Sequence, residues 1–291
     1  MNYTPNVSVI VPVYNAEKAI QICVHSLLAL DYPKGNLELV FVNNRSTDNT
    51  HRLLSGFSEQ IKILHEMKKG PAAARNKGIL NSSGEIIAFT DADCSVDKNW
   101  LKKIVKPLQD ESIGIVGGKI LSKRPCNKIE EFGEKIHDQG KAINEFKPPY
   151  VITMNWASRR SVITEVGLFD ESFTRCEDVD LSHKIMQADY RLVYQPEAII
   201  YHGNEKTLSG LFIEGFKHGF WSIKVHKKWK YLISQFGHCR FNFSTYKDLL
   251  ESLINYLTGQ DRHHNICYFF FNLGKKFGKI SGSFRFLYVD L

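Results

Sequence analysis

The stretch EIIAFTDADC, residues 85–94, places an apolar run directly before two carboxylates that are separated by one alanine. Such a run predicts a buried strand, and acidic residues at a strand end usually mark a turn into solvent. Asp91 and Asp93 are residues i and i+2, which point to the same side of an extended chain. Two hard oxygen ligands that face one point suit Mg²⁺ or Mn²⁺ sharing its shell with phosphate oxygens. The stretch alone therefore leaves two interpretations open, a solvated turn or a metal site.

Similar apolar runs lie on either side of this stretch and alternate with amphipathic segments. The runs predict strands at 7–14, 37–42, 61–64, 85–90 and 113–118, and the segments predict helices at 17–30, 47–57, 71–80 and 97–108. The strands lack strict polar alternation, which is typical of a parallel sheet covered on both faces. Strand–helix alternation predicts an open, doubly wound α/β sheet, in which ligands bind at the carboxyl ends of the strands.

The second part of the chain continues this pattern after an interruption. Residues 122–150 are polar and are interpreted as an excursion over the sheet. We then predict a strand at 151–158, a helix at 159–166, a turn at 167–173, a helix at 179–188 and two strands at 191–194 and 198–202. The rest of the chain is predicted to be helical and amphipathic.

Charge divides the chain of 291 residues unevenly. From Glu205 onward there are 13 Lys and Arg against 6 Asp and Glu, so this part carries the whole net charge of +7, and it also holds 19 of the aromatic residues. We therefore predict a first domain at 1–204 and a helical, basic and aromatic extension at 205–291.

Six scattered cysteines without a CxxC pair argue against a zinc ribbon or a disulfide framework, and reduced thiols are expected. The N-terminus shows no basic region followed by a cleavage site, and no stretch approaches the ~20 apolar residues of a membrane span. A cytoplasmic location is expected.

Three further segments carry candidate chemistry. In VNNRSTDNT, residues 42–50, Asn43 and Asn44 can hydrogen-bond a base or sugar, or the segment is only a turn with a helix cap. In GPAAARNKG, residues 70–78, Arg75 can reach a diphosphate, or it is a surface arginine on an alanine-rich helix. In RCEDVDLSHKI, residues 175–185, one carboxylate can act as a general base, or the acids only complement a helix dipole.

These elements, in this order, resemble the inverting family 2 glycosyltransferases of GT-A fold. VSVIVPVYN resembles the opening strand of the family, and the segment with Asn43, Asn44 and residues 46–48 resembles its VDDGSTD-type segment. The family's ARN, DxD and ED elements are matched by residues 74–76, 91–93 and 177–178. The resemblance covers about residues 7–202 and implies a Rossmann-like, mostly parallel central sheet flanked by helices.

The resemblance also implies roles for individual residues. Asp178 would be the catalytic base, and Asp93 the principal metal ligand, for Mn²⁺ or Mg²⁺. His202 matches a place where some relatives supply a further metal ligand, although a lone histidine at a strand end is more often structural. The other residues implied to bind the donor or acceptor are Pro12, Val13, Tyr14 and Asn43 around the nucleobase, Asn15 and Glu17 on the ribose side, Arg75, Asp91 and Ala92 around the diphosphate, ribose or sugar, and Trp156 and Glu177 around the sugar or acceptor.

Asn43 departs from the family pattern, which commonly has an acid that accepts from uracil N3–H. An asparagine can accept through its carbonyl and donate through its amide, so uridine stays the first choice while guanosine and thymidine donors stay open. The implied reaction transfers a sugar from a nucleoside diphosphate sugar, with a UDP-sugar first, to a hydroxyl of a glycan or lipid-linked acceptor in the synthesis of cell-surface polysaccharide or glycolipid.

The segment FIEGFKHGFWSIKVHKKWKYLI, residues 212–233, mixes aromatic and lysine residues. It is interpreted either as a basic amphipathic helix on the cytoplasmic face of an anionic membrane or as a helical subdomain over the acceptor cleft. A nucleic-acid partner is not expected, since no binding module accompanies it. Two other functions stay open: a sugar-1-phosphate nucleotidyltransferase, although its usual glycine-rich N-terminal signature is missing, and a non-catalytic sugar-nucleotide or glycan-binding module.

Overall fold

The computed structural model describes residues 3–237 and 244–290. Contacts within the chain divide it into two units: unit 1 comprises residues 1–123 and 137–202, and unit 2 comprises residues 124–136 and 203–291. Cysteines 23, 94, 126, 176 and 267 are free thiols, while Cys239 lies outside the described residues. The roles that the sequence suggests for 1–204 and 205–291 remain predictions.

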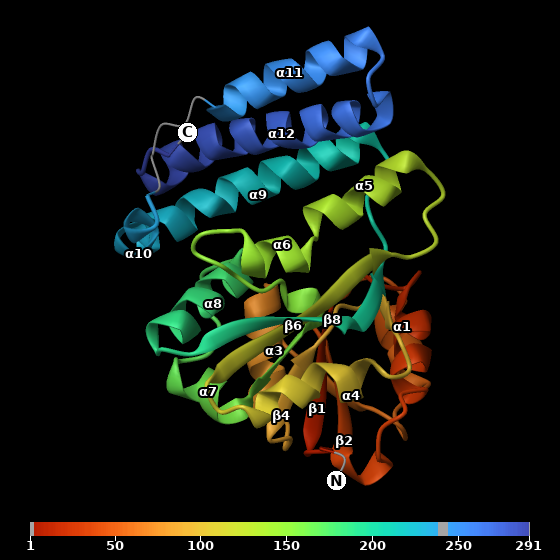
Figure 1. The fold of residues 1–291 in the computed structure, drawn as a ribbon. Helices are drawn as coiled ribbons and strands as arrows, with labels where there is room; N and C mark the ends of the chain where they lie inside the picture. The colour runs from red at the N-terminus through yellow and green to blue at the C-terminus, as the bar shows by residue number, and fades with distance from the viewer. Residues whose placement is uncertain (1–2, 238–243, 291) are drawn as a thin grey trace. The chain divides into compact units, whose positions relative to one another are not determined.

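Unit 1 contains an eight-stranded sheet flanked by helices (Figure 1). Its strands are β1 (Val7–Val13), β2 (Leu37–Asn43), β3 (Lys62–His65), β4 (Ile86–Phe89), β5 (Cys94–Val96), β6 (Ile113–Ser122), β7 (Trp156–Arg159) and β8 (Arg191–His202). Its helices are α1 (Ile20–Leu28), α2 (Thr50–Ser55), α3 (Pro71–Leu80), α4 (Trp100–Val105), α6 (Gln139–Asn144), α7 (Arg160–Glu165) and α8 (Glu177–Gln187), with short 3₁₀ turns η1 (Lys34–Asn36), η2 (Lys106–Gln109) and η3 (Thr153–Asn155).

The sheet has the strand order β3-β2-β1-β4-β7-β6-β8-β5. Strands β3, β2, β1 and β4 run parallel to one another, as do β6 and β8, whereas β7 and β5 run antiparallel to their neighbours. The carboxyl ends of β1, β2 and β4 therefore meet at one edge, where the sequence predicts the ligand site. The α/β fold with a mostly parallel sheet is confirmed.

Both faces of the sheet are covered by apolar side chains. Val9 and Val11 of β1 pack with residues of α1 and α4, while Ile10 between them packs with residues of α3, α7 and α8. Successive residues of a strand point to opposite faces, so a strand that is covered on both sides needs an unbroken apolar run. This is why the strands of unit 1 show no polar alternation.

The structure differs from the sequence prediction in several elements. Residues 191–194 and 198–202, predicted as two strands, form the single strand β8, which carries an irregularity opposite Gly118 and Lys119. Pro196 cannot donate to a ladder, so the sequence pattern breaks where the strand continues. The predicted excursion at 122–150 contains two helices, α5 (Lys128–Ile136) and α6. Strand β5 lies in a stretch for which the sequence predicts no strand.

Unit 2 is helical, as the sequence predicts. It consists of α5, α9 (Leu208–Lys228), α10 (Lys230–Gln235), α11 (Ser244–Thr258) and α12 (Arg262–Phe286). Helices α9 and α12 meet at glycines: a Cβ added to Gly219 would overlap the carbonyl oxygen of Lys275, and one added to Gly278 would overlap that of Phe216. No helix among residues 3–237 and 244–290 is both long and apolar enough to cross a membrane.

Candidate active site

The loops that follow β1 and β2 are joined by hydrogen bonds at the carboxyl edge of the sheet. Asn15 Oδ1 accepts from the backbone N–H of Thr47 at 2.8 Å. Glu17 Oε2 accepts from the backbone N–H and the side chain of Asn49, at 3.1 and 3.2 Å. Asn15 and Glu17, predicted on the ribose side, therefore hold the two loops together, and this structural use occupies a carboxylate oxygen of Glu17 and the carbonyl oxygen of Asn15.

The residues predicted around the nucleobase lie on these neighbouring strands. Val13 pairs with Asn43 in the register of β1 and β2, and Val13 is buried. Pro12 is half-buried, and Tyr14 is 56% exposed. Asn43 is buried, and its Oδ1 accepts from the backbone N–H of Ser46 at 3.1 Å. Tyr14 and Pro12 thus offer accessible surface beside a fixed amide.

Asn44 has a structural role instead of the ligand contact predicted for it. Its Nδ2 donates to the backbone carbonyls of Glu66 and Lys68, at 3.0 and 2.7 Å, and its Oδ1 accepts from Gly70 N–H at 2.9 Å. All of these partners lie in the loop between β3 and α3. The side chain is therefore saturated by the loop that leads to Arg75.

The two acids of the DxD element lie in a turn, so the prediction that strand alternation aims them at one point is wrong. Strand β4 ends at Phe89, and the backbone N–H of Cys94 donates to the carbonyl of Asp91 at 3.0 Å. Asp91 and Asp93 consequently have different partners. Ala92 between them is buried, which leaves only its backbone as a means of donor contact.

Arg75 is the centre of the acid cluster. Its guanidinium donates from Nη1 to Glu177 Oε1 at 2.5 Å and from Nη2 to Asp91 Oδ1 at 2.9 Å. The side chain is 3% exposed, and its charge lies 5.8 Å from the ring centre of Phe169. Burial acts to lower the pKa of Arg75, but Asp91 and Glu177 outweigh it and raise that pKa. Arg75 therefore links the DxD turn to the start of α8, and its contact with a diphosphate stays a prediction.

Burial raises the pKa of both carboxyl groups that bind Arg75. Burial raises the pKa of Asp91, with Arg75 opposing and Asp93 adding to the rise. Burial, with the charge of Asp178 adding, raises the pKa of Glu177 to about 7 against the pull of Arg75. One guanidinium faces three neighbouring carboxylates, so the cluster carries excess negative charge and favours a proton or a cation.

Asp178 follows Glu177 at the start of α8 and is half-buried. Its Oδ2 lies 3.3 Å from the backbone N–H of Thr153 and 3.5 Å from the Thr153 hydroxyl. Ser182 fixes the same region, because its hydroxyl donates to the carbonyl of Asp178 and accepts from the N–H of Val151. The contacts of Asp178 Oδ2 with Thr153 are long, while its Oδ1 accepts from the backbone N–H of Val179 at 2.9 Å, so the carboxylate is held at both oxygens.

Sequence reasoning did not find Thr153 or Asn76 as parts of this site. Asn76 clamps the loop before α8: its amide exchanges hydrogen bonds with the backbone N–H and carbonyl of Phe169, at 3.1 and 3.0 Å, and donates to Glu171 at 2.9 Å. The ARN element could have indicated Asn76, whereas nothing in the apolar stretch 151–158 marks Thr153.

Asp93 and His202 form a separate pair. Asp93 Oδ2 lies 3.5 Å from His202 Nε2, and the Asp93 side chain is 53% exposed. Burial acts to raise the pKa of Asp93, but the hydrogen bond and charge of His202 outweigh it and lower that pKa. An ionised, accessible carboxylate beside an imidazole nitrogen is a donor set that fits Mn²⁺, so the residues present fit the implied metal.

Trp156 is buried in the core, which corrects its predicted contact with the sugar or acceptor. The side chain is 1% exposed and packs on Phe89 and Phe169, with ring centres 4.9 and 6.0 Å away. Phe169 in turn lies against Arg75. Trp156 is therefore connected to Arg75 of the acid cluster through Phe169.

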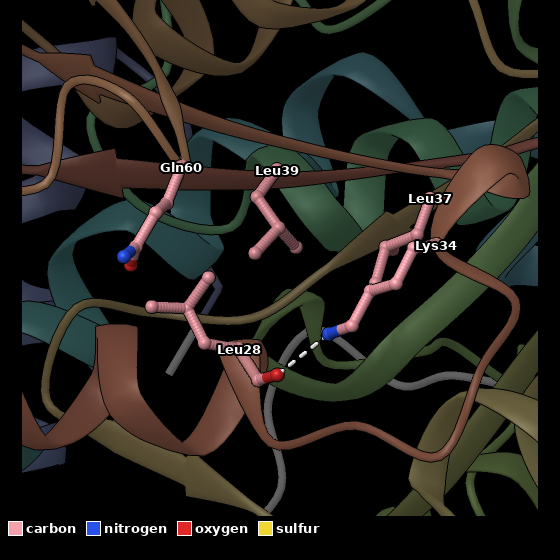
Figure 2. A pocket seen from close by; sticks show the side chains of 5 residues that line it. All are labelled: Leu28, Lys34, Leu37, Leu39 and Gln60. Atoms are coloured by element: carbon pink, nitrogen blue, oxygen red, sulfur yellow. Dashed lines mark hydrogen bonds between the residues drawn. The ribbon is translucent and has the colours of Figure 1, made fainter.

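A pocket lies at the opposite edge of the sheet (Figure 2). It is lined by Leu28, Lys34, Leu37, Leu39 and Gln60, and Lys34 Nζ donates to the carbonyl of Leu28 at 2.7 Å. Leu37 and Leu39 stand at the beginning of β2, far along the strand from Asn43. Because ligands of such folds bind at the carboxyl ends of the strands, this pocket is not the donor site.

The fold and the acid cluster define an α/β protein with buried carboxylates at the carboxyl edge of a mostly parallel sheet, and comparisons with known proteins identify its family. The sequence profile described as Glycosyl transferase family 2 matches residues 8–167. Glycosyltransferase AglE of Haloferax volcanii is 33% identical over 204 residues, which cover 68% of this chain and 67% of that protein. The pre-mycofactocin glycosyltransferase of Mycobacterium tuberculosis is 29% identical over 70% of this chain, and the match spans 44% of its length.

Solved structures share the fold. The mannosyltransferase PcManGT from Pyrobaculum calidifontis, in complex with GDP-Man and Mn²⁺, superposes with a TM-score of 0.74 at 19% identity, covering 97% of this chain and 88% of that one. Residues 1–349 of S. aureus TarS, in complex with UDP-GlcNAc, give a TM-score of 0.57 at 18% identity, covering 97% and 92% of the two chains. The chain belongs to glycosyltransferase family 2. It is a glycosyltransferase with a GT-A fold.

Proposed function

We propose that the protein is a metal-dependent, inverting glycosyltransferase that moves a sugar from a nucleoside diphosphate sugar to a hydroxyl of a glycan or lipid-linked acceptor. The observation that carries this proposal is the bridge from Asp91 through Arg75 to Glu177. It joins the DxD turn to the start of α8, which supports the assignment of Asp91, on the donor side, and Asp178 to one site in unit 1. The products would serve the synthesis of cell-surface polysaccharide or glycolipid.

Asp178 is the proposed general base. Its carboxylate, oriented by Thr153, accepts the proton of the acceptor hydroxyl while the hydroxyl oxygen bonds to the anomeric carbon and the bond to the diphosphate breaks. The attack and the departure take place on opposite faces of that carbon, which inverts its configuration. No covalent bond to the enzyme is needed. Asp91 and Glu177, held by Arg75, are proposed to orient the sugar.

Asp93 and His202 are the proposed protein ligands of the divalent ion. A bound Mn²⁺ or Mg²⁺ supplies positive charge that stabilises the leaving diphosphate. The complex of the Pyrobaculum calidifontis mannosyltransferase contains Mn²⁺, which supports the presence of an ion here and names Mn²⁺ as the first to test.

Pro12, Tyr14 and Asn43 are the proposed nucleobase contacts. The Asn43 carbonyl oxygen already accepts from Ser46 N–H and keeps one lone pair for a base N–H, while the amide group can donate to a base carbonyl. A uracil satisfies both, so a UDP-sugar is proposed first. The relatives with solved complexes hold GDP-Man and UDP-GlcNAc, so guanosine donors belong in the same test.

The test of this function is a panel of nucleotide sugars with Mn²⁺ or Mg²⁺, in which released nucleoside diphosphate is measured with and without acceptor sugars. Asp178→Asn should lower transfer by about 10²–10⁴-fold and leave donor binding nearly unchanged. Asp189→Asn, at the other end of α8, is the matched control and should transfer normally. Equal loss of donor binding in Asp178→Asn would remove Asp178 from the role of base, and absence of binding and release with every donor would contradict the proposal.

We also propose that unit 2 contacts an anionic membrane surface. Phe277, Ile280, Phe284 and Leu287 recur at intervals of three and four residues along α12 and its C-cap, and are 52%, 42%, 79% and 85% exposed. The glycines of α12 occupy a different side, against α9. Lys227 reaches this end of α12 by donating to the carbonyl of Phe286 at 2.7 Å, and the region from Glu205 carries a charge of +7. An apolar stripe beside lysines matches an anionic bilayer.

Sedimentation with vesicles tests this contact. The protein should sediment with vesicles that contain phosphatidylglycerol and less with neutral phosphatidylcholine vesicles, and the double variant Phe284→Ser/Leu287→Ser should lose most of the binding. Met67→Ser removes an apolar residue of unit 1 that is 75% exposed and should have no effect. Unchanged vesicle binding by the double variant, or a dimer in light scattering that the double variant dissolves, would contradict the membrane assignment.

A further inference from the structure

The chain just before Thr153 runs along the first turn of α8, beside the proposed general base. The backbone N–H of Val151 donates to the Ser182 hydroxyl at 3.0 Å, and that hydroxyl donates to the carbonyl of Asp178 at 2.7 Å. Two residues further on, the backbone N–H of Thr153 lies 3.3 Å from Asp178 Oδ2. Tyr150 directly precedes Val151, so these hydrogen bonds hold its backbone next to the start of α8.

The side chain of Tyr150 also interacts with Asp178. Burial raises the pKa of Tyr150, and the charges of Asp178 and Cys176 add to the rise. The phenol therefore stays protonated near neutral pH and places an uncharged ring near the carboxylate. The residue is half-buried, so part of this ring is accessible.

Phe146 and Tyr150 form an aromatic pair at the end of α6. Their ring centres lie 5.6 Å apart with the planes at 52°, and Phe146 is 44% exposed. Both residues are fixed to α6, because the N–H of Phe146 donates to the carbonyl of Lys141 at 3.1 Å and that of Tyr150 to the carbonyl of Ala142 at 3.2 Å. One exposed aromatic side chain is ordinary on a protein surface. Here two anchored rings lie together beside a proposed catalytic carboxylate, all within unit 1.

We propose that Phe146 and Tyr150 bind a sugar ring of the acceptor, and that the hydroxyl from which Asp178 takes a proton belongs to this ring. The inference rests on the proposed function and deepens it, because it identifies the acceptor as a saccharide at the point of attack. One face of a pyranose consists mainly of C–H groups, which carry a slight positive charge and pack on the electron-rich face of an aromatic ring. The hydroxyls project from the edge of the pyranose, so stacking leaves them able to reach a carboxylate.

The neighbours of the aromatic pair favour a sugar over a lipid chain. Glu145 and Lys147, on either side of Phe146, are exposed and charged. A lipid chain gains most from a continuous apolar surface, and it would cover charged groups without offering them a hydrogen bond. The hydroxyls around the edge of a sugar satisfy such groups while its apolar face lies on the rings.

Saturation-transfer NMR on the full chain tests this site, with Mn²⁺ and UDP or GDP present and the methyl glycosides of glucose, galactose, mannose and N-acetylglucosamine as probes. Irradiation of the aromatic protons of the protein should saturate the C–H protons on one face of at least one glycoside. Decyl phosphate, which has a chain and no sugar, should not displace that glycoside. The measurement uses the wild type and needs no variant that folds.

Variants then separate the aromatic rings from apolar bulk. Phe146→Leu and Tyr150→Leu should each weaken glycoside binding about tenfold, raise KM for that acceptor by about the same factor and change kcat by less than about threefold. Tyr150→Phe keeps the ring and should bind within about threefold of the wild type. The matched control is Phe57→Leu, since the Phe57 ring meets that of His25 at 5.2 Å among the side chains on the α1 side of the sheet. This control should bind glycosides like the wild type.

Several results would overturn the assignment: no saturation of any glycoside by the wild type, displacement by decyl phosphate, wild-type binding in both leucine variants, an equal loss in Phe57→Leu, or a fall in kcat with KM unchanged. The binding measurements require no sugar transfer. Glycoside binding that depends on Phe146, in a protein that releases no nucleotide from any donor, would contradict the proposed function and support the sugar site. Transfer that neither leucine variant alters would support the function and contradict the site.

Discussion

Units 1 and 2 differ in the size of the residues that lie between their packed helices and strands. In unit 1, large side chains such as Phe41, Trp100 and Ile10 fill the space on the two faces of the sheet. In unit 2, glycines bring the backbones of α9 and α12 into direct contact. Large apolar side chains such as Phe284 and Leu287 stand on the outside, at the end of α12. Burial therefore selects large apolar side chains in unit 1 and small ones between α9 and α12.

The units also differ in how they use buried charge. In unit 1, Arg75 binds two carboxylates from separate elements at the proposed active site. In unit 2, the buried carboxylate of Asp290 binds His226 and Lys279 near the end of the chain. We therefore expect the stability of unit 1 to be most sensitive to the loss of a charged partner. The stability of unit 2 should be most sensitive to a side chain added between α9 and α12.

Arg75→Met should give the largest loss of stability. The substitution leaves Asp91 and Glu177 without their cation, which costs about 3–5 kcal/mol in the free energy of unfolding. The loss should shrink as the pH falls, because both carboxyls then bind protons. Arg160→Met is the control, since Arg160 donates to neutral groups, the carbonyls of Gly84 and Ile79 among them. Urea unfolding at pH 5 and pH 8 measures both variants, and an equal, pH-independent loss in the two would contradict this account.

Gly278→Ala should give the next largest effect, in unit 2. Alanine normally favours a helix interior by about 1 kcal/mol over glycine, but here its Cβ would overlap the carbonyl oxygen of Phe216. Overpacking against a backbone should reverse the sign and cost about 3 kcal/mol. Gly210→Ala in the first turn of α9 meets mainly the flexible end of Glu205 and should be neutral or stabilising. Stabilisation by Gly278→Ala in thermal melts would show that the glycine contact is not close.

The contrast between the units also explains how much of the fold could be predicted from the sequence. Strands such as β1 and β2 were predictable because burial on both faces leaves a continuous apolar run. The prediction divided β8 into two strands because Pro196 interrupts its apolar pattern. In the structure the strand continues past Pro196, and its pairing with β6 resumes after an irregularity. The helix boundaries of unit 2 were not predictable, since an apolar pattern does not reveal a buried face made of glycine.

The candidate site was predictable in its location but not in its contacts. The strand-end rule indicated Asp91, and the resemblance to family 2 glycosyltransferases added Arg75 and Glu177 to the same site. Whether a guanidinium points to a ligand or between two carboxylates depends on packing by Phe169 and Trp156, which no spacing shows. The contact of Thr153 with Asp178 depends in the same way on the path of a loop.

The pH dependence of stability tests the excess negative charge of the unit 1 cluster. The pKa of Glu177 is raised from 4.5 to about 7, so between these values the folded protein holds a proton that the unfolded chain releases. The stability from this group is fully present below pH 4.5 and is lost as the pH rises through about 7, on the order of 3 kcal/mol. Glu177→Gln should flatten this part of the stability curve, measured by urea unfolding from pH 4.5 to 8. Glu165→Gln, on an exposed part of α7, should keep the slope of the wild type.

Substitutions by glycine at two residues of unit 1 should give the smallest change in stability. They test whether glycine stabilises unit 1, as it does the contact between α9 and α12 in unit 2. Cys176, directly before Glu177, has a positive φ of 63°, and Asp189 at the other end of α8 has one of 62°. Glycine adopts this conformation without strain, so Cys176→Gly and Asp189→Gly should each raise stability by about 0.5 kcal/mol.

Only Cys176→Gly should lower the rate of transfer, by about threefold, because the residue sets the direction in which Glu177 and Asp178 leave the loop. Donor binding should be unchanged in both variants, since neither residue lies among the proposed nucleobase contacts. Equal activity of the two variants would mean that the backbone of Cys176 does not position the start of α8. Its position would then depend on the hydrogen bonds of Asn76 with Phe169 and of Arg75 with Glu177. In that case the side chains of unit 1, and not its strained backbone, would determine the position of the proposed base.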